Sequence, residues 1–326
     1  MTNVYFFNDI EKLPKALDTL NINDFSNHMV PIKLHMGELG NTYFIPPSFV
    51  KLVIDKLKKV GAEPYLYDTT VAYNAPRSTI YGYHMVAHKH GFFKEKTGCD
   101  VVIGDKGTEV NEGGYSFEVA REIYESSHIV VISHAKGHVL TGFGGAIKNL
   151  GMGGVTRRMK RIIHDWGMPR YCSEECDLCG ICAEVCPPHA IIVDSDWRFD
   201  NLACVGCGKC VSICPRDALR YRVMDLQKGL SLAAKACIWG KKAIYINAIV
   251  NITRSCDCET NPGPIICPDI GYLVSVDPAA IDRASLDLIE GVKPGIFEET
   301  HKVDPYKQVE YAQKLGFDSY YEMLTM

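Results

Sequence analysis

The chain has 326 residues, a length that favours about two domains. Apolar residues make up 47% and charged residues 23%, which argues against a disordered, collagen-like or coiled-coil chain. Its 35 basic and 39 acidic residues leave a net charge of −4, so it offers neither a basic face for nucleic acid nor a polybasic membrane signal.

Short apolar runs of strand length alternate with helical patterns along the chain. Strands are predicted at Val30–Met36, Pro64–Tyr67, Val101–Gly104, Ile129–Ser133, Ala243–Ile249 and Tyr272–Val276. Helices are predicted at Pro47–Val60, Tyr81–His90, Ser116–Glu125, Met224–Cys237 and Pro278–Glu290. The alternation predicts an α/β fold, with a largely parallel sheet and helices on both of its faces.

A cysteine-rich block interrupts this alternation, from Gly167 to a return of helical pattern near Val223. We expect residues 168–222 to form a small α+β domain inserted into one α/β domain, whose two parts are residues 1–167 and 223–326. The basic run Arg157–Arg161 leads into the insert and is interpreted as a solvated connector.

The chain starts without a signal-peptide pattern and holds no uncharged apolar run of the roughly 18 residues that a membrane helix needs. We therefore expect a cytoplasmic protein without membrane association. In that reducing compartment, the 14 cysteines are expected to be metal ligands or catalysts before disulfides.

Eight of the cysteines form a duplicated motif with the spacing C-x2-C-x2-C-x3-C-P. The first copy is Cys176, Cys179, Cys182 and Cys186, and the second, 28 positions later, is Cys204, Cys207, Cys210 and Cys214. Three closely spaced thiolates can bind three irons of one [4Fe–4S] cluster, while the fourth cysteine ligates the other cluster. We therefore assign one cluster to Cys176, Cys179, Cys182 and Cys214, and the other to Cys204, Cys207, Cys210 and Cys186.

Two alternatives fit this block less well. Structural zinc sites usually use two separated C-x2-C pairs rather than this duplicated spacing. Cys172, Cys176 and Cys179 spell the C-x3-C-x2-C pattern of radical S-adenosylmethionine enzymes, but the last two already belong to the duplicated motif. From Cys176 to about Tyr221 the chain resembles the bacterial two-[4Fe–4S] ferredoxins, which implies a ferredoxin-like fold with two clusters.

A glycine-rich loop, Ser133–Gly154, follows a predicted strand and holds six glycines within thirteen positions. Such a loop lets the backbone approach a ligand and turn its amides toward an anion. Lys148 is placed to anchor a phosphate or carboxylate, and His134 and His138 could hold a metal or act as acid and base. The loop matches neither the Walker motif nor the dinucleotide fingerprint. The alternative is that the glycines only make tight turns and the histidines cap the strand end.

A second cysteine group, Cys256-Asp257-Cys258, follows the predicted strand Ala243–Ile249, with Cys267-Pro268-Asp269 shortly after it. Thiolates and carboxylates in this loop could bind a metal or line a substrate site, although free cysteines also pack as small apolar side chains. Arg77, Asp68 and Asp105 follow predicted strands and are weaker candidates for the same pocket.

The run from His138 to Gly153, the double cysteine motif, Cys256-Asp257-Cys258 and the run from Pro268 to Asp282 together resemble one family. It is the group of iron–sulfur centre proteins called "domain of unknown function 362", and the match spans about Val30 to about Glu290. The resemblance implies the architecture and the location of the site, but no substrate. Gly142–Lys148 is also similar, over that short run, to the glycine-rich lysine loop of nickel-pincer lactate racemases.

The leading hypothesis is a redox enzyme that passes electrons through the two clusters to an anionic ligand at residues 137–154. The expected catalytic residues are His134, His138 and Lys148, and the expected cofactor-binding residues are Gly142, Gly144, Gly145, Asn149, Cys256, Cys258 and Asp269. A further metal or organic cofactor could bind there. The electrons would come from, or go to, a redox partner protein or a small molecule. The alternatives are a non-catalytic electron carrier and a racemase-like isomerase with structural clusters.

Overall fold

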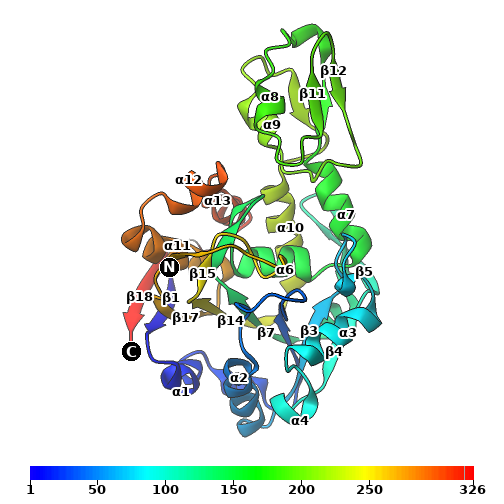
Figure 1. Cartoon of the computed structure of the whole chain (residues 1–326). Coiled ribbons are helices and arrows are strands. Elements are labelled where there is room, and N and C mark those ends of the chain that lie inside the picture. Colours follow the sequence, from blue (N-terminus) through cyan, green and yellow to red (C-terminus); the bar gives the residue numbers. More distant parts are fainter. Residues whose placement is uncertain (319) are drawn as a thin grey trace.

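The computed structural model describes residues 1–318 and 320–326, and its centre is one eight-stranded sheet (Figure 1). In spatial order the strands are β18 (Tyr321–Thr325), β1 (Thr2–Phe7), β17 (Gly271–Ser275), β14 (Lys242–Ile249), β7 (His128–His134), β2 (Met29–Leu34), β3 (Glu63–Thr69) and β4 (Val101–Gly104). The five neighbours from β14 to β4 are parallel, and β17 runs antiparallel to both β14 and β1. The predicted α/β class with a largely parallel sheet is confirmed.

Helices cover both faces of the sheet, and each face has its own apolar core. On one face lie α1 (Leu13–Asp18), α2 (Pro47–Lys59), α3 (Ile80–Lys89) and α4 (Lys94–Thr97). On the other lie α5 (Arg121–Glu125), α6 (Ala146–Gly153), α7 (Arg157–Trp166), α10 (Leu226–Ile238), α11 (Pro278–Val292), α12 (Ile296–His301) and α13 (Lys307–Lys314). Figure 1 shows α2 and α6 on opposite sides of the strands.

The helix predicted at Ser116–Glu125 is wrong over its first half. Residues 115–120 form strand β6 (Tyr115–Ala120), which pairs antiparallel with β5 (Gly107–Glu112). Gly113 and Gly114 link the two strands and both have positive φ, which only glycine adopts without strain. A Gly-Gly turn of this kind starts a hairpin, so the chain turns back as a strand before α5 begins.

The cysteine-rich segment builds its own small sheets, and its structure repeats with the same 28-residue offset as its sequence. One copy contains β10 (Pro169–Tyr171), α8 (Ile181–Glu184) and β11 (Ile191–Val193), and the other β12 (Trp197–Phe199), α9 (Lys209–Ile213) and β13 (Leu219–Tyr221). β10 pairs with β13 and β11 with β12, so the copies are interlocked. The segment projects from the main sheet between α7 and α10 (Figure 1).

Within the described residues, no helix combines the length and the apolar character that crossing a membrane requires.

Candidate functional site

An open cavity of about 140 Å³ lies where the parallel strands β2, β3 and β7 end. Because the carboxyl ends of parallel strands meet at one edge of the sheet, side chains that follow each strand converge there. Lys33 and His35 come from β2 and the loop after it, Asp68 from β3, and Ser133 and His134 from β7. The glycine-rich loop borders the same cavity.

Two buried lysines at this edge are held by groups from distant elements. Lys33 Nζ forms an ion pair with Asp68 Oδ1 at 3.0 Å and donates to Asn149 Oδ1 at 2.5 Å. Lys160 Nζ donates to Thr69 Oγ1 and to the Thr70 carbonyl, both at 2.7 Å, and burial lowers the pKa of Lys160 to about 7. The interpretation of residues 157–161 as a solvated connector is therefore wrong for Lys160, since one face of α7 packs onto the pocket.

Lys148, on α6, differs from these lysines because its amine has no hydrogen-bond or ion-pair partner in the part of the chain that the structure describes. It lines the cavity, and burial together with the nearby Lys33 lowers its pKa to about 8. A partnerless amine in a pocket with several other cations is suited to bind an anionic group of a ligand.

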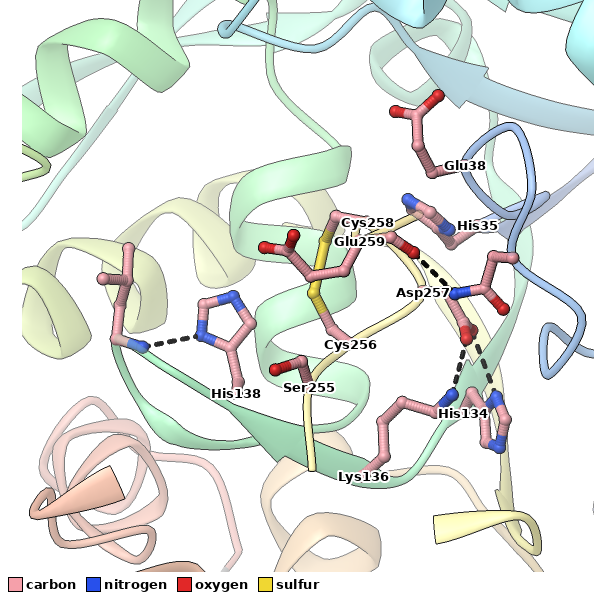
Figure 2. The surroundings of a disulfide bond; sticks show 12 residues. His35, Glu38, His134, Lys136, His138, Ser255, Cys256, Asp257, Cys258 and Glu259 are labelled. Carbon is pink, nitrogen blue, oxygen red and sulfur yellow. Dashed lines mark hydrogen bonds and ion pairs between the residues drawn. A yellow bond between two sulfur atoms is a disulfide. The ribbon is translucent and has the colours of Figure 1, made fainter. Parts of the chain in front are cut away.

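The carboxylate of Asp257 contacts the side chains of both Lys136 and His134 (Figure 2). It accepts from Lys136 Nζ at 2.6 Å and lies 3.1 Å from His134 Nδ1, and these cations hold its pKa well below the usual range despite burial. His134 Nε2 donates to the Val250 carbonyl at 2.6 Å. Both ring nitrogens of His134 thus have partners within the protein, and His134 holds the Asp257 loop in place.

Cys256 and Cys258 face the cavity from the loop between β15 (Ile252–Thr253) and β16 (Ile265–Cys267), and they are joined as a disulfide. One nitrogen of His138 lies within 4.8 Å of both sulfurs. His138 belongs to β8 (Lys136–His138), which forms a hairpin with β9 (Gly142–Gly144). The structure thus brings His138 next to Cys256 and Cys258, which follow it by 118 and 120 positions in the sequence.

The glycine-rich loop does not offer its helix amides to a ligand, contrary to the prediction. The amides of Ala146 and Ile147 donate to the carboxylate of Asp282 at 2.7 and 2.9 Å, so the chain itself caps α6. A Cβ on Gly145 would lie 2.2 Å from Asp282 Oδ1, which explains the need for glycine there. Gly144 and Gly145 line the cavity, whereas Gly142 packs against the backbone of Val303 and Pro305.

Asn149 lines the cavity, but its amide is used within the protein. Its Nδ2 donates to the Ile132 carbonyl at 2.9 Å and to Ser133 Oγ at 3.0 Å, while its oxygen accepts from Lys33. Asn149 therefore ties α6 to the end of β7 and orients Lys33.

Three other candidates lie away from the cavity. Asp269 is exposed and accepts the backbone amide of Asn251 at 2.6 Å. Cys267 is buried in the apolar core, and Asp105 accepts the amide of Arg157 at the start of α7. None of them is brought to the cavity by the fold.

The eight motif cysteines line two separate small cavities in the cysteine-rich segment. One, of about 20 Å³, is lined by Cys176, Cys179, Cys182 and Cys214. The other, of about 10 Å³, is lined by Cys186, Cys204, Cys207 and Cys210. Each cavity thus contains the four cysteines predicted to act together, three from one copy of the motif and one from the other.

The spacing of these sulfurs bears on which group they could hold. Four thiolates around one zinc ion lie about 3.8 Å from each other, given a Zn–S bond of about 2.3 Å and tetrahedral geometry. Among the described residues, only one group of at least three His, Cys, Asp or Glu side chains has its ligand atoms within 4.8 Å of one another. That group is His138, Cys256 and Cys258. No three sulfurs of the eight cysteines therefore lie as close together as the ligands of one ion do, although each set of four surrounds a single cavity.

Backbone amides point at some of these sulfurs in equivalent places of the two copies. Leu178 N lies 3.4 Å from Cys176 Sγ, and Gly206 N lies 3.4 Å from Cys204 Sγ, 28 positions later. Both residues have positive φ, 58° and 65°. N–H···S hydrogen bonds of this kind stabilise negative charge on a metal-bound thiolate.

The second copy of the motif makes the contact with the main pocket through His164. This residue of α7 lines the pocket, and its Nδ1 donates to the Val205 carbonyl at 2.9 Å. Gly206 packs so tightly that a Cβ there would lie 1.9 Å from the His164 carbonyl oxygen. Lys209 Nζ adds a bond of 2.6 Å to the His301 carbonyl. The loop between Cys204 and Cys207 is therefore one side chain away from the pocket.

The sequence analysis did not predict that Lys33, Lys136, Lys160 and His164 line the cavity, although the position of Lys33 in the sequence was a signal. Lys33 interrupts the apolar strand Met29–Leu34, and a charge within a buried strand requires a buried partner. The other three gain their place only through packing.

Comparisons with known proteins give a family but no activity. No curated protein matches the chain. The lactate racemase apoprotein from Thermoanaerobacterium thermosaccharolyticum is similar in structure with a TM-score of 0.42 and 13% identity, over 76% of this chain and 50% of that one. A Thermotoga maritima protein gives 0.43 and 12%, over 90% of this chain and 59% of that one. The chain thus spans only half to three-fifths of these proteins, and at such TM-scores they carry no argument about its function.

The family profile described as domain of unknown function (DUF362) matches residues 30–287, which is most of the chain and close to the extent that its motifs predicted. This protein therefore belongs to the DUF362 family.

Proposed function

We propose that this protein is an iron–sulfur oxidoreductase that delivers electrons to an anionic ligand bound beside Lys148. Cys176, Cys179, Cys182 and Cys214 would hold one [4Fe–4S] cluster, and Cys204, Cys207, Cys210 and Cys186 the other. Bound there, the clusters supply one-electron transfer. The observation that carries the proposal is the division of the eight cysteines into two cavities, each lined by one complete ligand set.

The pocket supports a small anionic ligand rather than a protein surface. It is a cavity at the edge of the sheet, and the free amine of Lys148 faces it. Other cations there have partners within the protein: Lys33 has Asp68, Lys136 has Asp257, and Arg77 has Glu38. Lys148 is thus the group available to bind a carboxylate or phosphate.

The link through His164 favours an enzyme over a free electron carrier. A carrier needs an exposed cluster but no cavity behind it, whereas here the loop after Cys204 is hydrogen-bonded to a residue that lines the cavity. A docked protein or a small molecule would exchange electrons with the other end of the inserted segment.

The test is anaerobic purification of the full chain followed by iron, sulfide, zinc and nickel analysis. Two clusters require about eight irons and eight sulfides per chain. Cys176→Ser and Cys204→Ser should each lose about half of the iron. Cys172→Ser is the matched control, because Cys172 lies in the same segment but lines neither cavity.

Each outcome decides between functions. Two zinc ions without sulfide would contradict the proposal. Anion binding at Lys148 is measured with inorganic phosphate and with small carboxylates, in the wild type and in Lys148→Met. Eight irons per chain without anion binding would favour the electron carrier. Anion binding with interconversion of substrate stereochemistry, unaffected by loss of the clusters, would favour the isomerase.

A further inference from the structure

The C-x-C loop presents its two sulfurs to the pocket while its middle residue is fixed behind them (Figure 2). The Asp257 side chain is clamped by Lys136 and His134, and its carbonyl accepts the amide of Glu38 at 2.9 Å. Cys256 and Cys258 are half-buried, line the cavity and are joined to each other. The loop is therefore anchored in a way that does not depend on the bond between the sulfurs.

His138 is placed to move a proton at this pair. Its Nδ1 lies 3.2 Å from the Leu140 amide nitrogen and 3.0 Å from Thr141 Oγ1, so both hydrogen-bond contacts of the ring are at Nδ1 and Nε2 is left for a group in the pocket. Figure 2 shows the other ring nitrogen on the side turned toward the disulfide. Burial lowers the pKa of His138 well below its usual value, and Lys148, His301 and His164 around it act in the same direction.

We propose that Cys256 and Cys258 are a two-electron disulfide–dithiol couple of the pocket, with His138 as its proton carrier. Reduction breaks the S–S bond, takes up two electrons and two protons, and leaves two thiols. Reoxidation returns two electrons and two protons to a two-electron acceptor held beside Lys148. The electrons come from one-electron donors, which in this chain are the two clusters, so this part of the inference rests on the proposed function.

The couple gives a reason for two one-electron centres next to one pocket. A disulfide needs two electrons for a complete reduction, and a single one-electron donor would leave a reactive radical. The same three atoms could instead bind a soft metal ion such as zinc once the sulfurs are thiolates. We favour the couple because the Cα atoms of Cys256 and Cys258 lie 5.3 Å apart, within the range of residues that form a disulfide.

The experiment measures the redox state of the pair in the full, metal-analysed chain by thiol alkylation and mass spectrometry. Trypsin releases residues 255–283 as one peptide that holds both cysteines and Cys267. Cys267, buried in the core, serves as the internal reference for a free thiol. One sample is equilibrated with mixtures of oxidised and reduced dithiothreitol, and another is treated with dithionite while the visible spectrum reports cluster reduction.

We expect Cys256 and Cys258 to be joined after oxidation and both alkylated after reduction. The midpoint reduction potential of the pair should fall as the pH rises, with the slope of a reaction that takes up two protons with two electrons. Cys256→Ser should leave Cys258 alkylated under all conditions. His138→Gln should slow the dithionite reduction at least several-fold and weaken its pH dependence, whereas His84→Gln, the same change on α3, should do neither.

The failures are distinguishable. Two results would overturn the couple whatever the iron content. The first is that Cys256 and Cys258 are free thiols in every buffer, and the second is that one zinc or nickel ion binds per chain and is lost in Cys256→Ser. A pair that responds to dithiothreitol in a chain without iron would retain the couple and refute the proposed function. Clusters that bleach while the pair stays oxidised would refute the link between them.

Discussion

Gly206→Ala tests whether the inserted segment is joined to the pocket through the close contact with His164. Gly206 has a φ of 65°, and a Cβ there would lie 1.9 Å from the His164 carbonyl oxygen, against the 3.0 Å that Cβ contacts keep. The positive φ alone costs alanine about 1–2 kcal/mol, partly offset by about 0.4–1 kcal/mol from the restricted unfolded chain. Leu178, the equivalent residue of the first copy, tolerates a φ of 58° with a full side chain.

Relief of the contact requires the loop to move away from α7. That movement breaks the His164–Val205 bond, worth about 0.5–1.5 kcal/mol, and strains the Lys209–His301 bond, worth about 1.5–3 kcal/mol because the donor is charged. We therefore expect Gly206→Ala to cost about 2–4 kcal/mol beyond its backbone strain.

The assay compares thermal unfolding midpoints of the anaerobically purified variants. Gly180→Ala is the matched control, since Gly180 also has positive φ in the inserted segment but has open space around its Cβ position. At about 2–4 °C per kcal/mol for domains of 150–250 residues, Gly206→Ala should unfold at least roughly 4 °C below Gly180→Ala. Equal midpoints for the two variants would refute the reasoning.

Two further predictions concern charges in the pocket. The lowered pKa of Lys148, about 8, means that the folded state disfavours its charge, so stability is reduced below pH 8 and recovers as the pH rises toward 10.5. At pH 7, Lys148→Met should therefore have a free energy of unfolding up to about 3 kcal/mol above that of the wild type in denaturant titrations, and above pH 10.5 the two should not differ. A variant less stable than the wild type at pH 7 would contradict this. Asp257→Asn leaves Lys136 and His134 buried without their carboxylate and should cost about 3–5 kcal/mol in denaturant unfolding. Lys136→Met in the same chain should recover part of that loss, and a double variant as unstable as the sum of the single ones would argue against the ion pair.

The sequence by itself determined the features that depend on local order. The predicted parallel strands are present within two residues at each end, because apolar runs and glycine stops are local signals. Cys214 lines one cavity with the first cysteine set and Cys186 lines the other with the second, the grouping that the ligand rule of the C-x2-C-x2-C-x3-C-P motif predicts. The terminal strands β1 and β18 were missed because they are stabilised by pairing with each other across the whole chain.

Only the tertiary structure decided how the pocket is equipped. Lys33, Asp68, Lys160 and Asn149 come from four elements, and each is satisfied by a partner that the sheet order and helix packing bring to it. Asp282 caps a helix that begins 136 positions earlier, which removes from ligands the amides that a glycine-rich loop had been expected to offer. A buried polar group must find a partner, but the sequence does not show which distant residue will arrive, since that depends on the packing of the complete chain.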